Sequence, residues 1–185
     1  MALESNNKNK PAKKVVALQE PHPVTSKGKR PWNRVNLPVY SISSKTESNC
    51  NMHIITYASQ ISMQPKRFVC GIYHGTQTLL NVEASGEFVL QLLADTQYRL
   101  VDLLGKKSGK TIDKINRLQK RNELSEWNGY HILKNCLAVI QLKVSGSFEG
   151  GDHKGFLCDV VAYKNLNEGV ALTLDTLREH KLIRI

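Results

Sequence analysis

Apolar and polar residues alternate along several short segments, which is the pattern of half-buried β-strands. The clearest segment is 136–147, where Ile140, Leu142 and Val144 alternate with polar residues. Alternation, or a high content of β-branched and aromatic residues, predicts further strands at residues 39–43, 52–57, 67–73, 87–93 and 155–163. About six strands that pair over long sequence distances predict a mainly β fold, a barrel or a sandwich.

Three helices are predicted between these strands. Residues 76–84 begin at a threonine suited to capping, Thr76, and end before Gly86. Residues 98–104 form the second helix, and residues 111–122 form the third, with apolar residues on one stripe. A second face of the third helix carries basic residues, for which a solvated surface is the favoured interpretation: Lys110, Lys114, Arg117 and Arg121.

Composition bounds these possibilities. The chain has 185 residues, a length that suits one domain, and 41% hydrophobic residues, which excludes wholesale disorder. It shows neither a membrane-length apolar run nor an N-terminal apolar signal region. The four cysteines form no C-x-x-C pair, which is typical of reduced intracellular thiols, so a cytoplasmic protein is expected.

The net charge of +10 is concentrated at the N-terminus. Residues 1–34 hold eight basic and two acidic residues together with four of the six prolines. Such a segment buries too little apolar surface to offset its ordering entropy, so we expect a flexible basic arm followed by one domain at 35–185. Organelle targeting by this arm, or its packing on the body or on a partner subunit, stays open.

Several familiar motifs fail on spacing. Residues 105–111 resemble a phosphate loop, but three residues separate the glycines where four are needed, and the preceding segment is predicted to be helical. A Rossmann G-x-G-x-x-G and an H-E-x-x-H are absent. Cys50 with His53, and Cys70 with His74, fit no zinc finger; a small buried hydrophobe is the favoured interpretation of Cys70, and no metal site is predicted.

A run of small polar residues between strands remains as a candidate anion site. It continues through residues 74–78 into a helix N-terminus, whose free N–H groups and threonine hydroxyls suit a phosphate. The alternative is that Thr76 merely caps its helix and that Thr56 and Ser59 are turn residues. Spacing alone does not decide between them.

The order of these segments resembles the flavin reductase-like family of FMN-binding split barrels. The resemblance is carried by residues 51–65, 74–79 and 85–90, by Gly109 with Asp113 and Lys114, and by residues 150–161 with Asp152 and His153. It covers about residues 36 to 180. It implies a six-stranded split barrel with flanking helices, usually a homodimer, with FMN near the subunit interface.

The resemblance also implies roles for residues. His153 would lie near the flavin or nicotinamide, as a positioning residue, although a structural histidine fits equally well. The proposed FMN contacts are Asn51, Thr56, Tyr57, Ala58, Ser59, Tyr73, His74, Thr76, Thr78, Lys110 and Lys114. Two departures from the family pattern are Ile54, where a threonine is commoner, and Cys158, where glycine is usual.

The leading hypothesis is an NAD(P)H-dependent flavin oxidoreductase, in which ring stacking supplies most of the catalysis. Its partner would be free flavin or an electron-acceptor protein, with neither a membrane nor a nucleic acid expected. The alternative is a basic β-barrel that binds nucleic acid through the cluster around residues 106–121, although few aromatic residues accompany that cluster. A third use of the cluster is attraction of a dinucleotide's phosphates. Haem-binding and pyridoxamine-phosphate variants of the fold also stay open.

Overall fold

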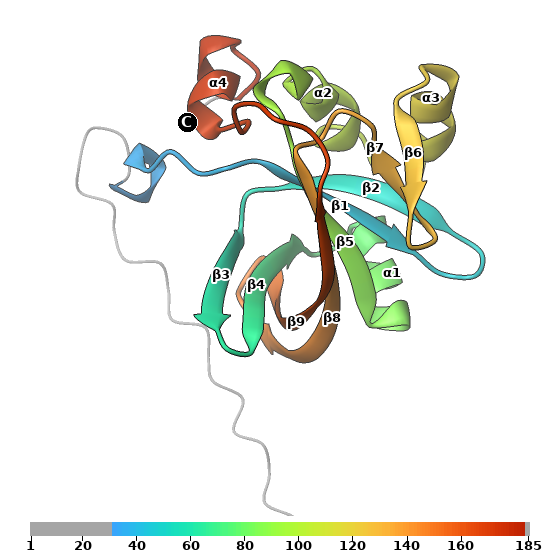
Figure 1. Cartoon of the computed structure of the whole chain (residues 1–185), viewed down its shortest axis with the longest axis vertical. Coiled ribbons are helices and arrows are strands. Elements are labelled where there is room, and N and C mark those ends of the chain that lie inside the picture. The colour runs from blue at the N-terminus through green and yellow to red at the C-terminus, as the bar shows by residue number, and fades with distance from the viewer. Residues whose placement is uncertain (1–30, 184–185) are drawn as a thin grey trace, which may run out of the picture.

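The computed structural model describes residues 31–183, which form a curled antiparallel sheet with helices around it (Figure 1). The chain runs in this order: a 3-10 turn (Pro31–Arg34), β1 (Tyr40–Lys45), β2 (Cys50–Ile55), β3 (Ala58–Met63), β4 (Lys66–Tyr73), α1 (Gln77–Ser85), β5 (Glu87–Leu92), a 3-10 turn (Asp95–Gln97), α2 (Leu100–Leu104), α3 (Lys114–Lys120), β6 (Leu124–Trp127), β7 (Tyr130–Leu133), β8 (Ala138–Glu149), β9 (His153–Asn165) and α4 (Leu174–Glu179).

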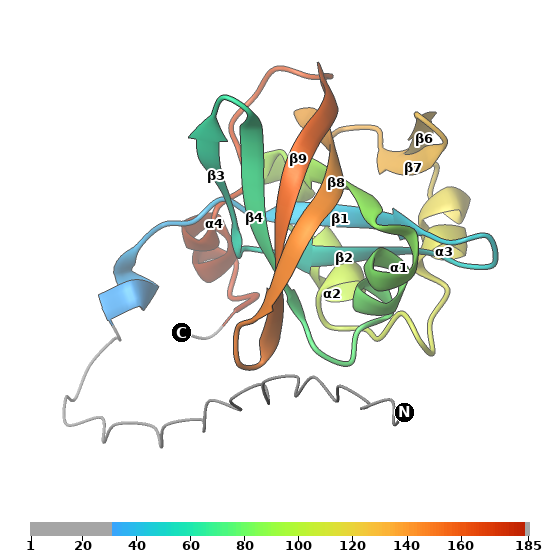
Figure 2. The same ribbon diagram turned by 90° about the horizontal axis from the view of Figure 1, so that it is seen from below.

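The main sheet has seven strands in the order β2-β1-β5-β8-β9-β4-β3 and curls into a barrel (Figure 2). Its long strands β8 and β9 form a hairpin that turns at Gly150 and Gly151. The two edge strands, β2 and β3, are consecutive in the chain and are joined by Thr56 and Tyr57. The barrel is therefore open between β2 and β3, with a two-residue connection at one end of the opening.

Helix α1 shows how locally its sequence determines its limits. The Oγ1 of Thr76 accepts a hydrogen bond from the backbone N–H of Leu79 over 3.2 Å, which caps the first turn. Gly86 ends the helix in the left-handed conformation with φ 69°, which glycine adopts without a Cβ clash. Both predicted limits of this helix are confirmed.

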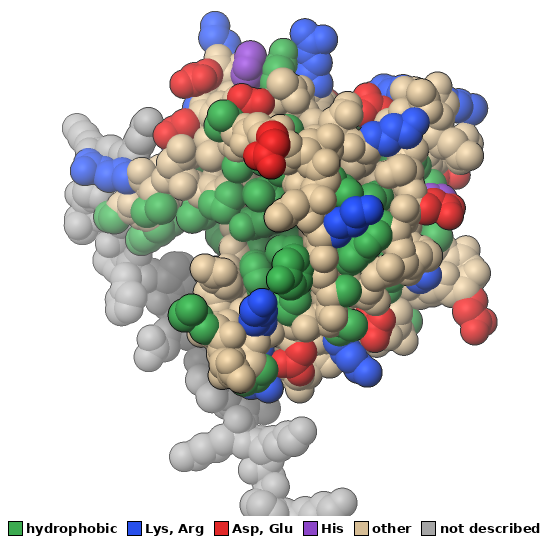
Figure 3. Space-filling view, viewed as in Figure 1, with side chains coloured by type: hydrophobic (Ala, Val, Ile, Leu, Met, Phe, Trp, Pro, Cys, Tyr) green, Lys and Arg blue, Asp and Glu red, His purple; other side chains and the backbone are tan. Residues whose placement is uncertain are grey.

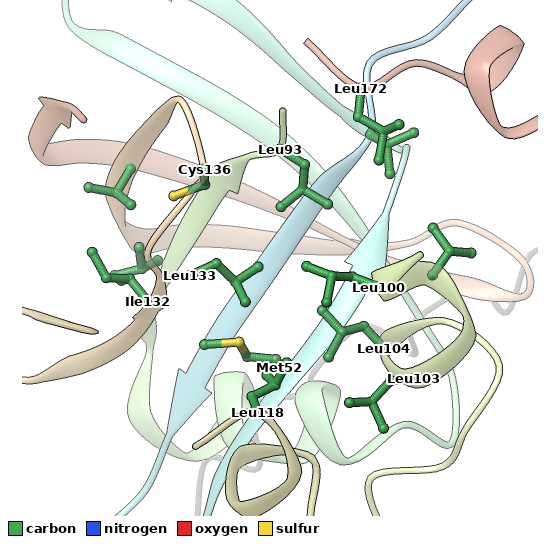
Figure 4. Packing of buried hydrophobic residues seen from close by; sticks show 14 of the residues in the cluster. Met52, Leu93, Leu100, Leu103, Leu104, Leu118, Ile132, Leu133, Cys136 and Leu172 are labelled. Carbon is green, nitrogen blue, oxygen red and sulfur yellow. The ribbon is translucent and has the colours of Figure 1, made fainter. Parts of the chain in front are cut away.

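Two groups of buried apolar side chains hold the layers together. One lies inside the barrel and includes Ile72 and Phe88, and α1 contributes Leu79 to it. The other lies between the sheet and the elements α2, α3 and β7, with Met52 and Leu104 among its members (Figure 4). The second group fixes the segment between α2 and α3 against β2, where the candidate site lies.

Several predicted elements differ from the structure. The predicted strand at 52–57 is β2, two residues earlier at each end, and the polar run after it forms an unpredicted strand, β3. Strand β3 brings the main sheet to seven strands where about six were expected. The separate β6–β7 hairpin and helix α4 were also not predicted. Residues 31–34 form a turn, whereas residues 1–30 of the predicted arm lie outside the described residues.

Candidate functional site

Three adjoining cavities lie along the opening of the barrel. The first, which we call the aromatic cavity, has a volume of about 480 Å³ and is lined from β3, β4 and the β8–β9 hairpin, including Tyr57, Phe148 and His153. The second, the central cavity, has about 640 Å³ and shares Thr56, Tyr57 and His153 with the first. The shared residues show that the two cavities adjoin.

The third, the polar cavity, has about 210 Å³ and lies between the start of α1 and the loop that follows α2. It shares residues with the central cavity from three different elements: His53 of β2, Tyr73 of β4, and Gly105 with Lys106 of the loop. One groove therefore runs from a polar end beside α1 to an aromatic end beside the β8–β9 hairpin.

The connection between β2 and β3 supplies the middle of the groove. The carbonyl of Tyr57 accepts a 2.7 Å hydrogen bond from the N–H of Gly71 on β4. A Cβ at position 71 would lie 3.2 Å from the Cβ of Tyr57, so glycine allows this close approach. Tyr57 lines the aromatic cavity and remains 59% exposed.

The imidazole of His153, at the start of β9, contacts two aromatic rings edge-on. Its ring centroid lies 4.9 Å from that of Tyr57 and 5.2 Å from that of Tyr73. The Nδ1 of His153 lies 2.7 Å from a carboxylate oxygen of Asp152. The hydrogen bond with His153 lowers the pKa of the Asp152 carboxyl.

The start of α1 faces the polar cavity with its backbone. The hydroxyl of Thr76 donates to the Tyr73 carbonyl over 2.9 Å and accepts from Leu79, so this side chain acts as a helix cap. The N–H groups of Gln77 and Thr78 precede the first intrahelical hydrogen bond. Together with the positive end of the helix dipole, these groups favour an anion at this position.

Lys114 brings a buried charge to the polar cavity. Its side chain is 2% exposed, and its Nζ donates a 2.8 Å hydrogen bond to the carbonyl of Leu104. Burial lowers the pKa of Lys114 to about 8. The expectation that Lys114 belongs to a solvated basic face is therefore wrong, because this residue points inward from α3 while Lys110 and Arg117 are exposed.

The structure brings most of the predicted contacts to the groove. Tyr73, His74, Thr76, Asn51 and Lys114 line its polar end, and Thr56, Tyr57, Ala58, Ser59 and His153 line its aromatic end. Asn51 is buried, however, and donates to the Oγ1 of Thr78 over 2.8 Å. Thr78 is fully buried and lines none of the three cavities, and Lys110 lines a separate cavity beside the β1–β2 loop.

Several groove residues were not predicted as cofactor contacts. Phe148 lies in the β8–β9 hairpin, and Lys106 and Lys107 belong to the basic cluster that entered only the alternative hypothesis of a nucleic-acid binder. His53 was considered only as a zinc ligand. It shares the face of β2 that carries Asn51, a relationship that the two-residue period of a strand could have revealed.

The polar end of the groove also bears on the nucleic-acid alternative. Lys106 pairs with Asp102 over 2.7 Å, and Lys114 is buried. The predicted basic cluster is therefore not one continuous surface. No helix within residues 31–183 is long and apolar enough to cross a membrane.

Comparison with solved structures supports the fold. The FMN-binding protein from Thermus thermophilus, solved with 1-cyclohex-2-enone, superposes with a TM-score of 0.66 at 21% identity, over 78% of this chain and 80% of that one. The styrene monooxygenase flavin reductase from Pseudomonas putida S12 gives 0.65 at 18%, over 78% and 89%. BorF, the flavin reductase component of a bacterial two-component tryptophan halogenase, gives 0.69 at 14%, over 79% and 90%.

Sequence comparison supplies the family. No curated protein matches the chain. A family model described as the flavin reductase like domain matches residues 32–178. This range includes every element from β1 to most of α4. It also includes every residue that lines the three cavities of the groove except Ile183. The split-barrel fold expected from the resemblance is confirmed, and the chain belongs to the flavin reductase-like family.

Proposed function

We propose that this protein is an NAD(P)H-dependent flavin oxidoreductase that binds FMN along the groove. The observation that carries the proposal is the groove's two chemically different ends. The polar end combines the N–H groups at the start of α1 with the ammonium of Lys114, and the aromatic end presents Tyr57, Phe148 and His153. A phosphate and a planar ring system, joined by a chain of hydroxyls, match these ends in order.

The residues of the polar end fit a phosphate dianion. Lys106, Lys107 and Lys114 line the cavity, and no carboxylate among the described residues does so. An anion there would gain charge-assisted hydrogen bonds and would offset the positive charge that Lys114 keeps in a buried position. When bound, FMN would supply the ring nitrogen that accepts hydride from a nicotinamide.

The residues of the aromatic end would orient the rings. Edge-on contacts from Tyr57 and Tyr73 fix the imidazole of His153, and Asp152 holds its Nδ1. This arrangement leaves His153 as a positioning residue for the nicotinamide or the flavin. Hydride transfer between stacked nicotinamide and flavin rings depends more on alignment of the two rings than on acid–base catalysis, and the proposed role of His153 is to align them.

The electron acceptor is free flavin or a partner protein. The flavin reductase components named above serve a halogenase and a styrene monooxygenase, and these similar folds support a partner of that kind. We propose that two copies of this chain associate as well. Exposed apolar side chains gather on the barrel face (Figure 3), and the set on β3 and β9 suits burial against a second copy: Ile61, Met63, Val161 and Tyr163.

Flavin titration tests the proposal. We expect the purified protein to quench FMN fluorescence with saturation and, once loaded, to oxidise NADH or NADPH. Lys114→Met should weaken FMN binding about tenfold or more, the effect of removing a hydrogen bond to a charged group. Lys110→Met is the matched control, because Lys110 lies in another cavity. A protein that takes up no FMN would contradict the proposal.

Association is tested separately by light scattering. The wild-type chain should have twice the monomer mass, and Met63→Lys together with Tyr163→Lys should shift it toward the monomer. A monomeric wild type at all concentrations would overturn the homodimer and would leave the FMN site unaffected.

A further inference from the structure

His53 lies at the junction of the polar and central cavities. It comes from the middle of β2, opposite Ile42 of β1, and its side chain is half-buried. Its position in both linings places it between the end of the groove suited to a phosphate and the end suited to a ring. The proposed flavin function assigns no role to this imidazole.

The surroundings of His53 are cationic. Lys114 of α3 and His153 of β9 act on it electrostatically, and the carbonyl of Leu104 at the end of α2 opposes them by favouring the protonated imidazole. The other titratable side chains that line the two cavities with it come from β4, the β2–β3 connection and the loops after β4 and α2: Tyr57, Tyr73, His74, Lys106 and Lys107. Among the described residues, no carboxylate lines either cavity.

This environment keeps His53 neutral when the groove holds no anion. Burial lowers the pKa of His53, and the charge of Lys114 lowers it further, to about 4. A phosphate carries a charge of about −1.5 to −2 near neutral pH. An opposite charge close to a titratable group typically changes its pKa by about 1–3 units in favour of the charged form.

We propose that His53 binds a proton when the phosphate of FMN enters the polar cavity, so that FMN binding is linked to proton uptake. The inference rests on the proposed function, since it assumes that FMN occupies the groove. The proton comes from solvent and stays on the imidazole, where it adds a second positive charge beside that of Lys114. His53 is thus a positioning residue for the cofactor's phosphate.

The direction of the pH effect follows from linkage. When binding raises the pKa of a group, affinity increases as the pH falls toward the pKa of the free state. Protonation of the phosphate itself, with a pKa near 6, acts in the opposite direction. The contribution of His53 is therefore measured as the difference in the pH dependence of FMN affinity between the wild type and a His53→Gln variant. Glutamine keeps a polar side chain that does not titrate.

The experiment is calorimetric titration of FMN at about pH 6.5 in two buffers that differ in ionisation enthalpy. For each FMN bound, the net proton uptake of the wild type should exceed that of His53→Gln by a measurable fraction of a proton, because release from the phosphate is common to both. The ratio of wild-type to His53→Gln affinity should increase about tenfold as the pH falls from 7.5 to 5.5, one pKa unit corresponding to a tenfold change. The imidazole NMR signals of His53 should report the same protonation directly.

Three controls make the outcome decisive. Riboflavin, which lacks the phosphate, should bind without proton uptake at His53. His131→Gln, in the β6–β7 hairpin, should behave as the wild type. Uptake that persists in His53→Gln and disappears in His74→Gln would overturn the inference, as would the same net proton exchange in the wild type and in His53→Gln. Absence of FMN binding would instead overturn the proposed function together with the inference.

Discussion

The Nδ2 of Asn51 donates to the Oγ1 of Thr78 over 2.8 Å, and this buried hydrogen bond joins β2 to the first turn of α1. Because the start of α1 forms the polar end of the groove, the bond positions that end relative to the sheet. Both residues were predicted to contact the cofactor. This hydrogen bond gives the pair a structural role in addition to the contact that the resemblance implies.

We expect Asn51→Ala to destabilise the fold by about 1–3 kcal/mol, because it leaves a buried hydroxyl without its donor and opens space. Urea unfolding measures the loss. Combining Asn51→Ala with Thr78→Val should recover part of it, since the second change removes the unsatisfied hydroxyl. Gln119→Ala, on the exposed face of α3, should stay within about 0.5 kcal/mol of the wild type. Additive losses in the double variant would contradict this account.

Lys114 makes stability depend on pH in alkaline solution. Its pKa is about 8 in the folded chain and close to 10.5 when unfolded, so the unfolded state binds more protons between these values and stability rises with pH. By pH 10 the gain should reach about 2–3 kcal/mol. The quantity to measure is the difference in unfolding free energy between the wild type and Lys114→Met, in which other titrations cancel. Parallel curves from pH 7 to 10 would show that the ammonium is not desolvated.

Asp152 is expected to act through His153. Asp152→Asn should leave the FMN affinity and the unfolding free energy nearly unchanged, because Asp152 is exposed. It should slow reduction of bound FMN by NADH about tenfold, since misplaced reacting groups lose rate. Stopped-flow absorbance under anaerobic conditions measures the step. Asp159→Asn is the matched control: it removes a half-buried ion pair between Asp159, elsewhere on β9, and Arg67 of β4, and should reduce FMN at the wild-type rate.

Gly109 packs directly on Asn51. A Cβ at this position would overlap the Asn51 amide, so Gly109→Ala must displace either the loop after α2 or that side chain. We expect FMN affinity to fall about tenfold or more, because a displacement of about 1 Å in a positioning element is costly. Gly146→Ala is the control, since a Cβ there would lie 3.9 Å from the Cβ of Leu157, an ordinary contact. Unchanged FMN binding in Gly109→Ala would show that the loop does not contact the cofactor.

The fold was largely predictable where local signals agree. Alternation identifies β8 and β9, and Thr76 with Gly86 limits α1 to within a residue. Strand β3 was not predicted, because it is an edge strand whose residues are mostly exposed on both faces and therefore show no alternation of apolar and polar residues. The β6–β7 hairpin could have been found, because Asn128 and Gly129 between apolar residues are a strong signal for a tight turn.

The site was less predictable because its chemistry depends on distant partners. Whether Asn51 faces a ligand or Thr78 is decided by packing between segments 27 residues apart. The helical pattern places Lys114 on a basic surface. Its burial is evident only from the structure, where its Nζ lies 2.8 Å from the carbonyl of Leu104 on another element. Alternation within a strand could place His53 beside the site, but its ionisation depends on neighbours from other elements.

The short connection between the edge strands has a mechanical consequence. Thr56 and Tyr57 are the two residues between the ends of β2 and β3, so those ends cannot part by more than about 10 Å. The connection therefore acts as a hinge at one end of the opening between β2 and β3, and any widening of that opening is greatest at the other end. Residues 56–59, which line the aromatic cavity, lie at this hinge, where a given rotation of the two strands displaces their atoms least.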